Sequence, residues 1–253
     1  MFSEREITGK KVLVTGGASG IGLCCVRLIA GMGARVAIIH LPEDPLAKDT
    51  IGDLTRNGLD VLSCPADVGE SSAEPAIAHA IDRLGGLDCL INSAGVALAR
   101  EPIPFSDLDA LSDEFWQQML SVNLLGAFRC ARAAAPALRA AKGAIVNVSS
   151  ASGEGKRGTS IPYSVSKGGL VTLTRCLAKA LAPEVRVNAV APGFIDTPMT
   201  ADRGTEYRAD VARKCLLQRV GTAEEVAEAI VFLCFGGGFM TGEVLTIDGG
   251  RSF

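Results

Sequence analysis

The sequence predicts an α/β fold, namely a single-domain, doubly wound parallel sheet with helices on both faces. Short apolar runs of strand length alternate along the chain with helical stretches of ten or more residues, a pattern that requires parallel pairing through helical crossovers. A glycine-rich turn follows the first apolar run. The chain has 253 residues, of which 48% are hydrophobic and 21% charged, so it is apolar enough to bury the hydrophobic core of such a domain.

The first half of the chain alternates four strands with three helices. Lys11 to Thr15 is a short apolar run that ends at the glycine cluster, and Gly33 ends the first helical pattern. The expected strands are 11–15, 34–39, 60–65 and 87–92, and the expected helices are 20–32, 44–57 and 71–84.

The second half continues the alternation with a long helical stretch over 113–141. The next strands are expected at 144–148, 185–191 and 243–247, and the next helices at 163–181 and 224–235. No Pro/Ser-rich linker or shift in composition divides the chain. We therefore expect residues 1–253 to form one domain, with residues 1–9 as a flexible N-terminal tail.

Charge and cysteine content argue against several classes of partner. There are 25 basic and 28 acidic residues and a net charge of −3, so neither nucleic acid nor an anionic membrane is an expected partner. The eight cysteines form no C-x-x-C pair and only two histidines exist, which favours reduced core thiols and no metal site. The charged N-terminus lacks the apolar region of a signal peptide and no long apolar span follows, so we expect a cytoplasmic protein.

The turn after the first strand has the composition of a phosphate-binding loop. It reads Thr15-Gly16-Gly17-Ala18-Ser19-Gly20-Ile21-Gly22 and opens the first helix. Glycines let the backbone approach a pyrophosphate, whose charge meets the free N–H groups and positive dipole of the helix N-terminus. Any strand-to-helix turn can also use glycine for shape alone, and the spacing here is not G-x-G-x-x-G.

Tyr163 and Lys167 lie four residues apart on a predicted helix, so phenol and ammonium share one face. Reduction of a ketone by hydride requires a proton for the developing alkoxide, and a phenol with a pKa of about 10 needs a nearby cation to serve near neutral pH. Lys167 supplies that cation, although the pair could also be an ordinary surface pair. Ser150 follows a strand directly and could stabilise the carbonyl oxygen or merely cap local backbone.

These motifs together resemble the short-chain dehydrogenase/reductase family over nearly the whole chain. Its T-G-x-x-x-G-x-G signature is met by Thr15, Gly16, Gly20 and Gly22, and Asn92-Ser93-Ala94-Gly95 is similar to its N-N-A-G with one substitution. The resemblance implies a Rossmann-like, nucleotide-binding oxidoreductase. It implies the catalytic residues Asn123, Ser150, Tyr163 and Lys167, with Asn123 holding a water of the proton relay and Ser149 as the neighbour that could be confused with Ser150. It implies cofactor contacts at Gly16, Ser19, Gly20, Ile21, Gly22, His40, Leu41, Asp67, Val68, Asn92, Ala94, Gly95, Tyr163, Lys167, Pro192, Gly193, Ile195 and Thr197.

The end of the second strand favours NAD over NADP. NAD-dependent members of the family usually carry an acidic residue there, whereas NADP-dependent members place Arg or Lys there or before the second glycine of the loop. This chain has His40, mostly neutral near pH 7, and neither Ser19 nor Leu41 supplies a cation. The preference for NAD therefore depends on missing cations, and NADP stays open.

The substrate pocket is expected where loops converge above the strand ends, from residues 96–112, 151–161 and 194–215. Their charged side chains fit a hydroxylated or anionic small molecule such as a sugar derivative, a keto acid or a 3-oxoacyl thioester, or they simply solvate the loops. The charges concerned are Glu154, Lys156, Arg157, Arg203 and Arg208.

Two other functions remain open at the level of sequence. A dinucleotide-binding sensor or scaffold could keep the fold without turnover, but it has no need of all four catalytic positions. An isomerase or epimerase would use bound NAD transiently. The resemblance also implies a homo-oligomer, a tetramer or a dimer, formed through the helices at 113–141 and 163–181.

Overall fold

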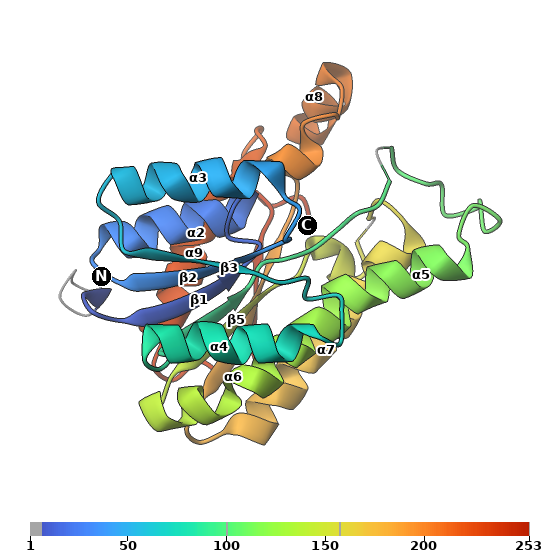
Figure 1. The fold of residues 1–253 in the computed structure, drawn as a ribbon. Coiled ribbons are helices and arrows are strands. Elements are labelled where there is room, and N and C mark those ends of the chain that lie inside the picture. The colour runs from blue at the N-terminus through green and yellow to red at the C-terminus, as the bar shows by residue number, and fades with distance from the viewer. Residues whose placement is uncertain (1–6, 100, 157, 253) are drawn as a thin grey trace.

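Seven parallel strands form one sheet at the centre of the molecule. The computed structural model describes residues 7–99, 101–156 and 158–252. The strand order is β3-β2-β1-β4-β5-β6-β9, and all six neighbouring pairs are parallel (Figure 1). The strands are β1 (Lys11–Thr15), β2 (Arg35–His40), β3 (Val61–Pro65), β4 (Cys89–Asn92), β5 (Ala144–Val148), β6 (Arg186–Pro192) and β9 (Val244–Ile247). The order reverses between β1 and β4, which creates the crevice where such sheets bind ligands.

Helices cover both faces of the sheet, as the sequence predicts. Figure 1 shows α2 (Gly20–Gly31), α3 (Pro45–Arg56) and α9 (Ala223–Phe235) on one face. The other face carries α4 (Ala73–Leu84), α6 (Ala127–Ala141) and α7 (Ile161–Leu181). Along β1, Val12 and Val14 pack into the core on the first face and Leu13 into the core on the second. Because successive side chains point to opposite faces and both are buried, the strand is an unbroken apolar run.

The segment before β1 is more firmly packed than we expected. Ile7 is fully buried in the core, Thr8 Oγ1 donates to Met32 O, and Gly9 N donates to Gly33 O at 2.9 Å. The prediction of a flexible tail over 1–9 therefore needs correction at residues 7–9. Residues 1–6 of that expected tail lie outside the described residues.

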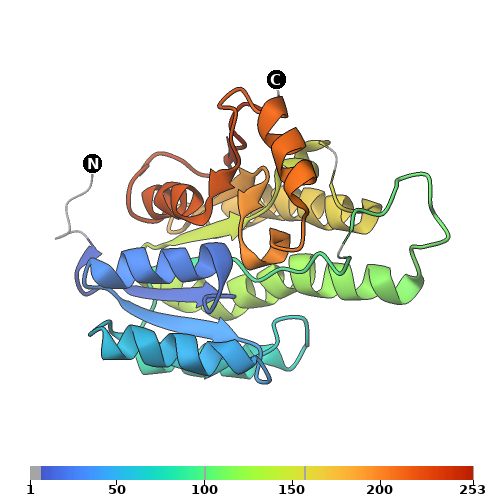
Figure 2. The ribbon, with the colours of Figure 1, turned by 90° about the horizontal axis from the view of Figure 1, so that it is seen from above.

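The long helix expected over 113–141 is three elements. It comprises α5 (Asp113–Leu120), the π-helical turn η1 (Ser121–Gly126) and α6, while the loop between β4 and α5 projects from the body (Figure 2). A π-turn widens a helix locally and commonly occurs at functional sites.

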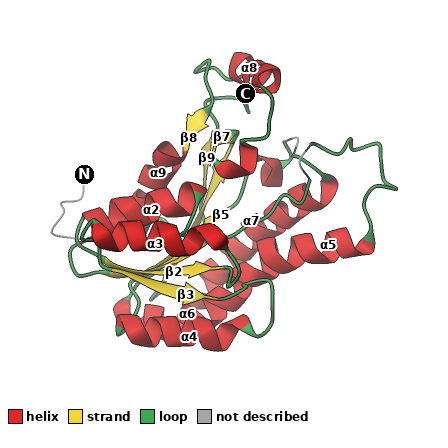
Figure 3. Cartoon of the chain, turned by 45° about the horizontal axis from the view of Figure 1, so that its top comes forward, coloured by secondary structure: helices red, strands yellow, loops and turns green. Residues whose placement is uncertain are grey.

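Several short elements were not predicted. The additional elements are η2 (Ala151–Glu154), β7 (Ile195–Asp196), η3 (Pro198–Thr200), α8 (Thr205–Lys214) and β8 (Gly221–Thr222). Strands β7 and β8 form a separate parallel pair, and α8 stands at the periphery of the molecule (Figure 3). All of them except η2, which follows β5, lie in the connection between β6 and α9.

All eight cysteines are free thiols, and six of them are buried. Among the residues described, no three His, Cys, Asp or Glu side chains gather in a way that could hold a metal ion. No helix in the described ranges combines the length and apolarity needed to cross a bilayer.

Candidate active site

The glycine loop brings the turn after β1 against the turn after β4. Gly16 has φ +65°, and a Cβ there would lie 2.9 Å from Ala94 Cα. Thr15 Oγ1 accepts hydrogen bonds from Ser93 N at 3.1 Å and Ala94 N at 3.0 Å. A Cβ on Gly22 would lie only 2.3 Å from Gly16 O, so α2 can start here only without a side chain at that position.

A cavity of about 200 Å³ opens above these turns, at the carboxyl ends of the strands. The predicted cofactor residues that line it are Gly16, Ser19, Gly20, Ile21, Ala94, Gly95, Tyr163, Lys167, Pro192, Gly193, Ile195 and Thr197. It is also lined by residues that we did not predict, namely Ser93, Val148, Ser149, Pro198, Met199 and Thr200, besides the catalytic candidate Ser150. Ser93 and Pro198 follow directly on predicted residues, and Val148 and Ser149 directly precede Ser150, so adjacency to a predicted residue was the signal for these four.

The cavity fits a dinucleotide phosphate on chemical grounds. The start of α2 lines it, the first turn carries no acidic residue, and Ser19 makes no side-chain cap, so N–H groups remain for an anion. Gly20 has φ +51°, a backbone conformation that favours glycine. At Gly95 a Cβ would lie 3.3 Å from Lys167 Nζ and would crowd the cavity wall.

Five predicted cofactor residues lie outside the cavity lining, besides Gly22 within α2. At the end of β2, the ring of His40 contacts Leu41 O through Nδ1 and Ser63 Oγ through Nε2, each at 2.9 Å. Asp67 Oδ1 accepts from Gly69 N at 2.8 Å, and Val68 is buried. The side chain of Asn92 is buried, and its Nδ2 donates to Asn147 Oδ1 at 2.9 Å, so the amide faces the protein interior.

Tyr163 and Lys167 lie on the first two turns of α7, which Ser160 caps by accepting from Tyr163 N. Lys167 is only 5% exposed, and its Nζ donates to Val148 O at 2.9 Å. Burial lowers the pKa of Lys167 to about 8. Nζ lies 5.9 Å from the centre of the Tyr163 ring, so both groups belong to one site.

The pKa of Tyr163 lies above its ordinary value in the protein without a dinucleotide. Burial raises it above its ordinary value, and the hydrogen bond with the Ser150 side chain opposes that shift only in part. Desolvation of the phenolate is the dominant cause. The downward shift expected from Lys167 together with the positive charge of a bound nicotinamide stays a prediction.

The structure separates the roles of the two adjacent serines. Ser149 Oγ donates to Lys167 O at 2.9 Å and joins β5 to α7. Ser150 is hydrogen-bonded to the Tyr163 side chain, and its Oγ also accepts from Ser152 Oγ at 3.0 Å. Ser150 is therefore the serine whose hydroxyl lies beside the phenol.

Asn123 lies in the π-turn and joins the loop after β4 to α7. Its Oδ1 accepts from Val96 N at 2.8 Å, and its Nδ2 donates to Val96 O and Ser166 Oγ at 3.0 and 3.1 Å. The amide thus fixes the backbone next to Gly95 and the helix that carries Tyr163 and Lys167. The water that the resemblance assigns to Asn123 stays a prediction.

A second, larger cavity of about 480 Å³ adjoins the first. Both are lined by Ser150 and Tyr163, and the larger one is also lined by residues of the predicted loops. Asp248, Arg251 and Ser252 line it too, and we did not predict them, although the Asp-Gly-Gly turn after the last strand was visible in the sequence.

The charged residues expected at the pocket divide into two groups. Lys156 and Arg203 line the larger cavity. Glu154 accepts from Thr246 Oγ1, and Arg208 pairs with Asp196 at 2.7 Å, so both have other partners. Arg157 lies outside the described residues.

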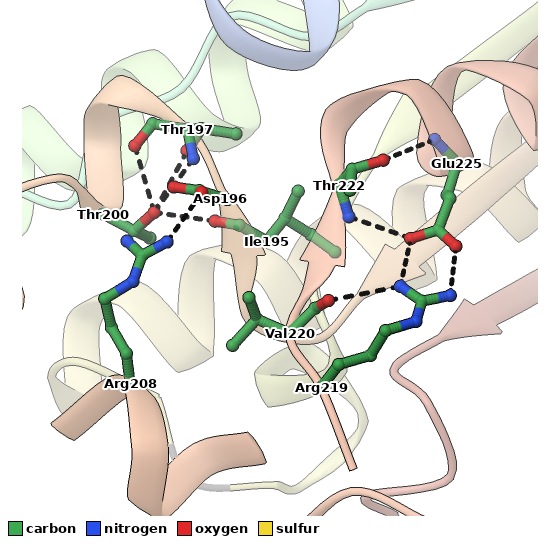
Figure 4. Close-up of polar contacts among 9 residues, drawn as sticks. All are labelled: Ile195, Asp196, Thr197, Thr200, Arg208, Arg219, Val220, Thr222 and Glu225. Atoms are coloured by element: carbon green, nitrogen blue, oxygen red, sulfur yellow. Dashed lines mark hydrogen bonds and ion pairs between the residues drawn. The ribbon is translucent and has the colours of Figure 1, made fainter. Parts of the chain in front are cut away.

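Two hydrogen-bonded turns lie close together, one in the segment after β6 and one at the start of α9 (Figure 4). Thr200 Oγ1 donates to Ile195 O at 2.7 Å and accepts from Thr197 N at 3.1 Å.

The second turn follows β8, the strand that pairs with β7, and there Thr222 and Glu225 form a reciprocal cap at the start of α9. The Arg219 guanidinium beside Glu225 is the main reason why the pKa of that carboxyl falls to about 2. Pairing of Ile195 with Gly221 joins the two turns and fixes the wall of the cofactor cavity.

The glycine loop, the Tyr163–Lys167 pair and the adjoining cavities together have the composition of a dinucleotide-dependent oxidoreductase site. A family model described as enoyl-(acyl carrier protein) reductase matches residues 16–252. A protein assigned as ketoacyl reductase 2 of the granaticin polyketide synthase of Streptomyces violaceoruber is 40% identical over 94% of each chain. The cis-4-hydroxycyclohexanecarboxylate dehydrogenase of Sinomonas cyclohexanicum is 38% identical over 98% of this chain and 97% of its own.

Solved structures agree with this assignment. A short-chain dehydrogenase from Burkholderia cenocepacia, determined in complex with NADP, is 30% identical with a TM-score of 0.88, over 98% of this chain and all of its own. The chain belongs to the short-chain dehydrogenase/reductase family. It is an NAD(P)-dependent oxidoreductase that acts on CH–OH groups and the corresponding carbonyls.

Proposed function

We propose that this enzyme interconverts a ketone and a secondary alcohol on a small polar or anionic substrate, using NAD in preference to NADP. The observation that carries the proposal is that the larger cavity and the glycine-lined cavity share Ser150 and Tyr163. A substrate in the first and a cofactor in the second would therefore meet at the hydroxyl pair. The candidate substrate classes are sugar derivatives, keto acids and 3-oxoacyl compounds.

Each catalytic candidate has a role that follows from its position. The nicotinamide ring supplies or accepts the hydride when it is bound. Ser150 donates a hydrogen bond to the carbonyl oxygen, and Tyr163 Oη gives that oxygen its proton, so that a ketone that gains a hydride becomes a secondary alcohol. Lys167, with a pKa of about 8, is largely charged at pH 7 and favours the phenolate left behind. Asn123 keeps the loop and α7 in register.

The cofactor preference is supported by the end of β2. His40 is held between Leu41 O and Ser63 Oγ, and Glu43 and Asp44 follow it in the chain. Two carboxylates close to this turn disfavour the additional phosphate of NADP. The solved NADP complex of a relative keeps the alternative open to test.

We also propose a homo-oligomer, a dimer or tetramer, that forms through α6, α7 and the π-turn. Leu125 of η1 is 45% exposed, Phe128 of α6 37% and Val165 of α7 48%. Large apolar side chains on neighbouring helices are typical of a surface that a second copy covers. The eight free thiols fit a reducing compartment such as the cytoplasm.

The test begins with titration of the purified protein with NADH and NADPH, followed by nicotinamide fluorescence. Tighter binding of NADH supports the cofactor assignment, and tighter binding of NADPH overturns it. Reduction of small ketones by the bound dinucleotide then tests the reaction itself. Binding of neither dinucleotide would contradict the proposed function as a whole.

A further inference from the structure

We infer that Arg203 binds a carboxylate of the substrate, so that this enzyme acts on a hydroxy or oxo carboxylic acid with an apolar body. The inference rests on the proposed function, since it places the reacting carbon beside Ser150 and Tyr163. It narrows the three candidate substrate classes to carboxylic acids and names Arg203 as the side chain that would select them.

Arg203 is an unusual residue for the wall of a cavity, because it is only 6% exposed. Within the described part of the chain its guanidinium makes two long contacts, Nη1 to Glu101 Oε2 and Nη2 to Ala99 O, each at 3.4 Å. The Glu101 side chain is 77% exposed, so water competes for its carboxylate. A guanidinium has five N–H donors and stays charged, which leaves donors for an anion in the cavity.

The other charges on the described wall favour an anion as well. Lys156 and Arg251 line the cavity together with Arg203, and Asp248 is the acidic residue among the lining groups. Asp248 already accepts hydrogen bonds from Gly250 N and Ser252 Oγ at the turn after β9. Lys156 is exposed and its Nζ donates to Ser252 O at 3.0 Å, and Arg251 is half-buried, so Arg203 is the buried cation of these three lining residues.

One part of the remaining wall suits a hydrocarbon, while Ser152, Thr159 and Thr200 line the cavity elsewhere. Phe194 and Tyr207 pack with ring centres 5.7 Å apart, and both line the cavity together with Met199. Hydroxyl groups placed against these ring and thioether surfaces would lack partners, so an apolar body suits this part of the wall. A carboxylate suits Arg203 because a guanidinium holds two carboxylate oxygens with two parallel hydrogen bonds.

The experiment compares a keto acid with its neutral analogue. We would measure kcat/KM for 4-oxocyclohexanecarboxylate and for 4-oxocyclohexanecarboxamide with the wild type and with Arg203→Gln. The wild type is expected to favour the carboxylate by about 100-fold, because loss of one partner of a buried charge pair costs about that factor or more. In Arg203→Gln the ratio of kcat/KM for the carboxylate to kcat/KM for the carboxamide should fall close to 1, mainly through a higher KM for the carboxylate. Arg203→Lys should restore part of the preference for the carboxylate.

Arg213→Gln is the matched control, because Arg213 is an exposed arginine of α8 that pairs with Asp210. Its ratio should equal that of the wild type. Thermal unfolding and dinucleotide binding of each variant verify that it folds. A ratio in Arg203→Gln that equals the wild-type ratio overturns the inference while the proposed function stands.

Binding of unreactive cyclohexanecarboxylate, measured by calorimetry on the enzyme with its dinucleotide, decides the inference without turnover. Binding to the wild type that is at least tenfold weaker in Arg203→Gln supports it, even where neither ketone is reduced and the proposed reaction fails. Equal affinity for both proteins, or no binding to the wild type, overturns it. Tighter binding of inorganic phosphate than of the carboxylate at the same site also overturns the assignment to a carboxylic acid.

Discussion

At the scale of single residues, Lys167 is the least exposed charged side chain in the described part of the chain. Its ammonium is buried beneath the cofactor cavity and donates to Val148 O. Burial alone lowers its pKa to about 8 from the ordinary value of 10.5. An unneutralised buried charge lowers the stability of the folded state, which is a cost that a site can carry when catalysis needs the charge.

That cost should depend on pH with a definite sign. The folded pKa lies below the unfolded one, so the destabilisation is complete below pH 8 and fades as the pH rises toward 10.5. The free energy of unfolding of Lys167→Met relative to the wild type should therefore fall by roughly 2–3 kcal/mol between pH 7 and pH 10, in the absence of dinucleotide. Urea titrations at both pH values measure it. The exposed Lys48→Met is the control, and a difference that does not change with pH would contradict the assignment.

Tyr163→Phe tests the proton donor. The variant keeps the ring and loses only the hydroxyl, so dinucleotide affinity should stay within about threefold while kcat falls by about 100-fold to 10,000-fold, the usual range for general acid–base catalysis. Fluorescence titration and steady-state kinetics give the two quantities. Near-native kcat in this variant would show that another group donates the proton.

At the scale of elements, the sequence was sufficient for the seven strands of the main sheet and for most of the helices between them, but not for the π-turn that divides 113–141 or for α8. Buried parallel strands are continuous apolar runs, and Val12, Leu13 and Val14 display that pattern directly. Strands β7 and β8 have two residues each, too few for any periodicity, and α8 has only Val211 buried, so its sequence is polar almost throughout. These elements depend on contacts with the rest of the fold.

The site was predictable where it follows strand ends and motifs, and not where it depends on three-dimensional packing. Ser150 and Tyr163 were identified correctly as neighbours from spacing and resemblance. The amide of Asn123 in the π-turn hydrogen-bonds the backbone of Val96, a contact across 27 positions of the chain that sequence spacing does not reveal. Arg251 and Ser252 reach the larger cavity only because β9 lies beside β6.

The start of α2 provides a prediction at this scale. In Gly22→Ala the added Cβ would lie 2.3 Å from Gly16 O, so the loop must move, and we expect a loss of about 1–3 kcal/mol in stability and at least tenfold weaker NADH binding. Gly31→Ala at the other end of the same helix meets no atom within 4 Å and should be neutral or stabilising by up to about 1 kcal/mol. Denaturant unfolding and NADH titration of both variants measure these effects, and equal behaviour would contradict the packing argument.

At the scale of the whole molecule, the exposed apolar side chains of η1, α6 and α7 predict the oligomeric state. Val165→Asp should reduce the native mass measured by light scattering from that of a dimer or tetramer to a smaller species, because a buried unpaired carboxylate opposes association. Leu46→Asp on α3, where the leucine is 68% exposed, should leave the mass unchanged. A monomeric wild type would contradict the proposed interface.

The walls of the smaller cavity come from positions far apart in the chain, from Gly16 after β1 to Thr200 after β7. A dinucleotide that fills this cavity would contact both halves of the sheet. Neither half could then unfold without release of the dinucleotide. At a concentration one hundred times its dissociation constant, such a ligand adds about 2.7 kcal/mol to the free energy of unfolding. The supply of dinucleotide would then regulate not only turnover but also the rate at which proteases destroy this enzyme.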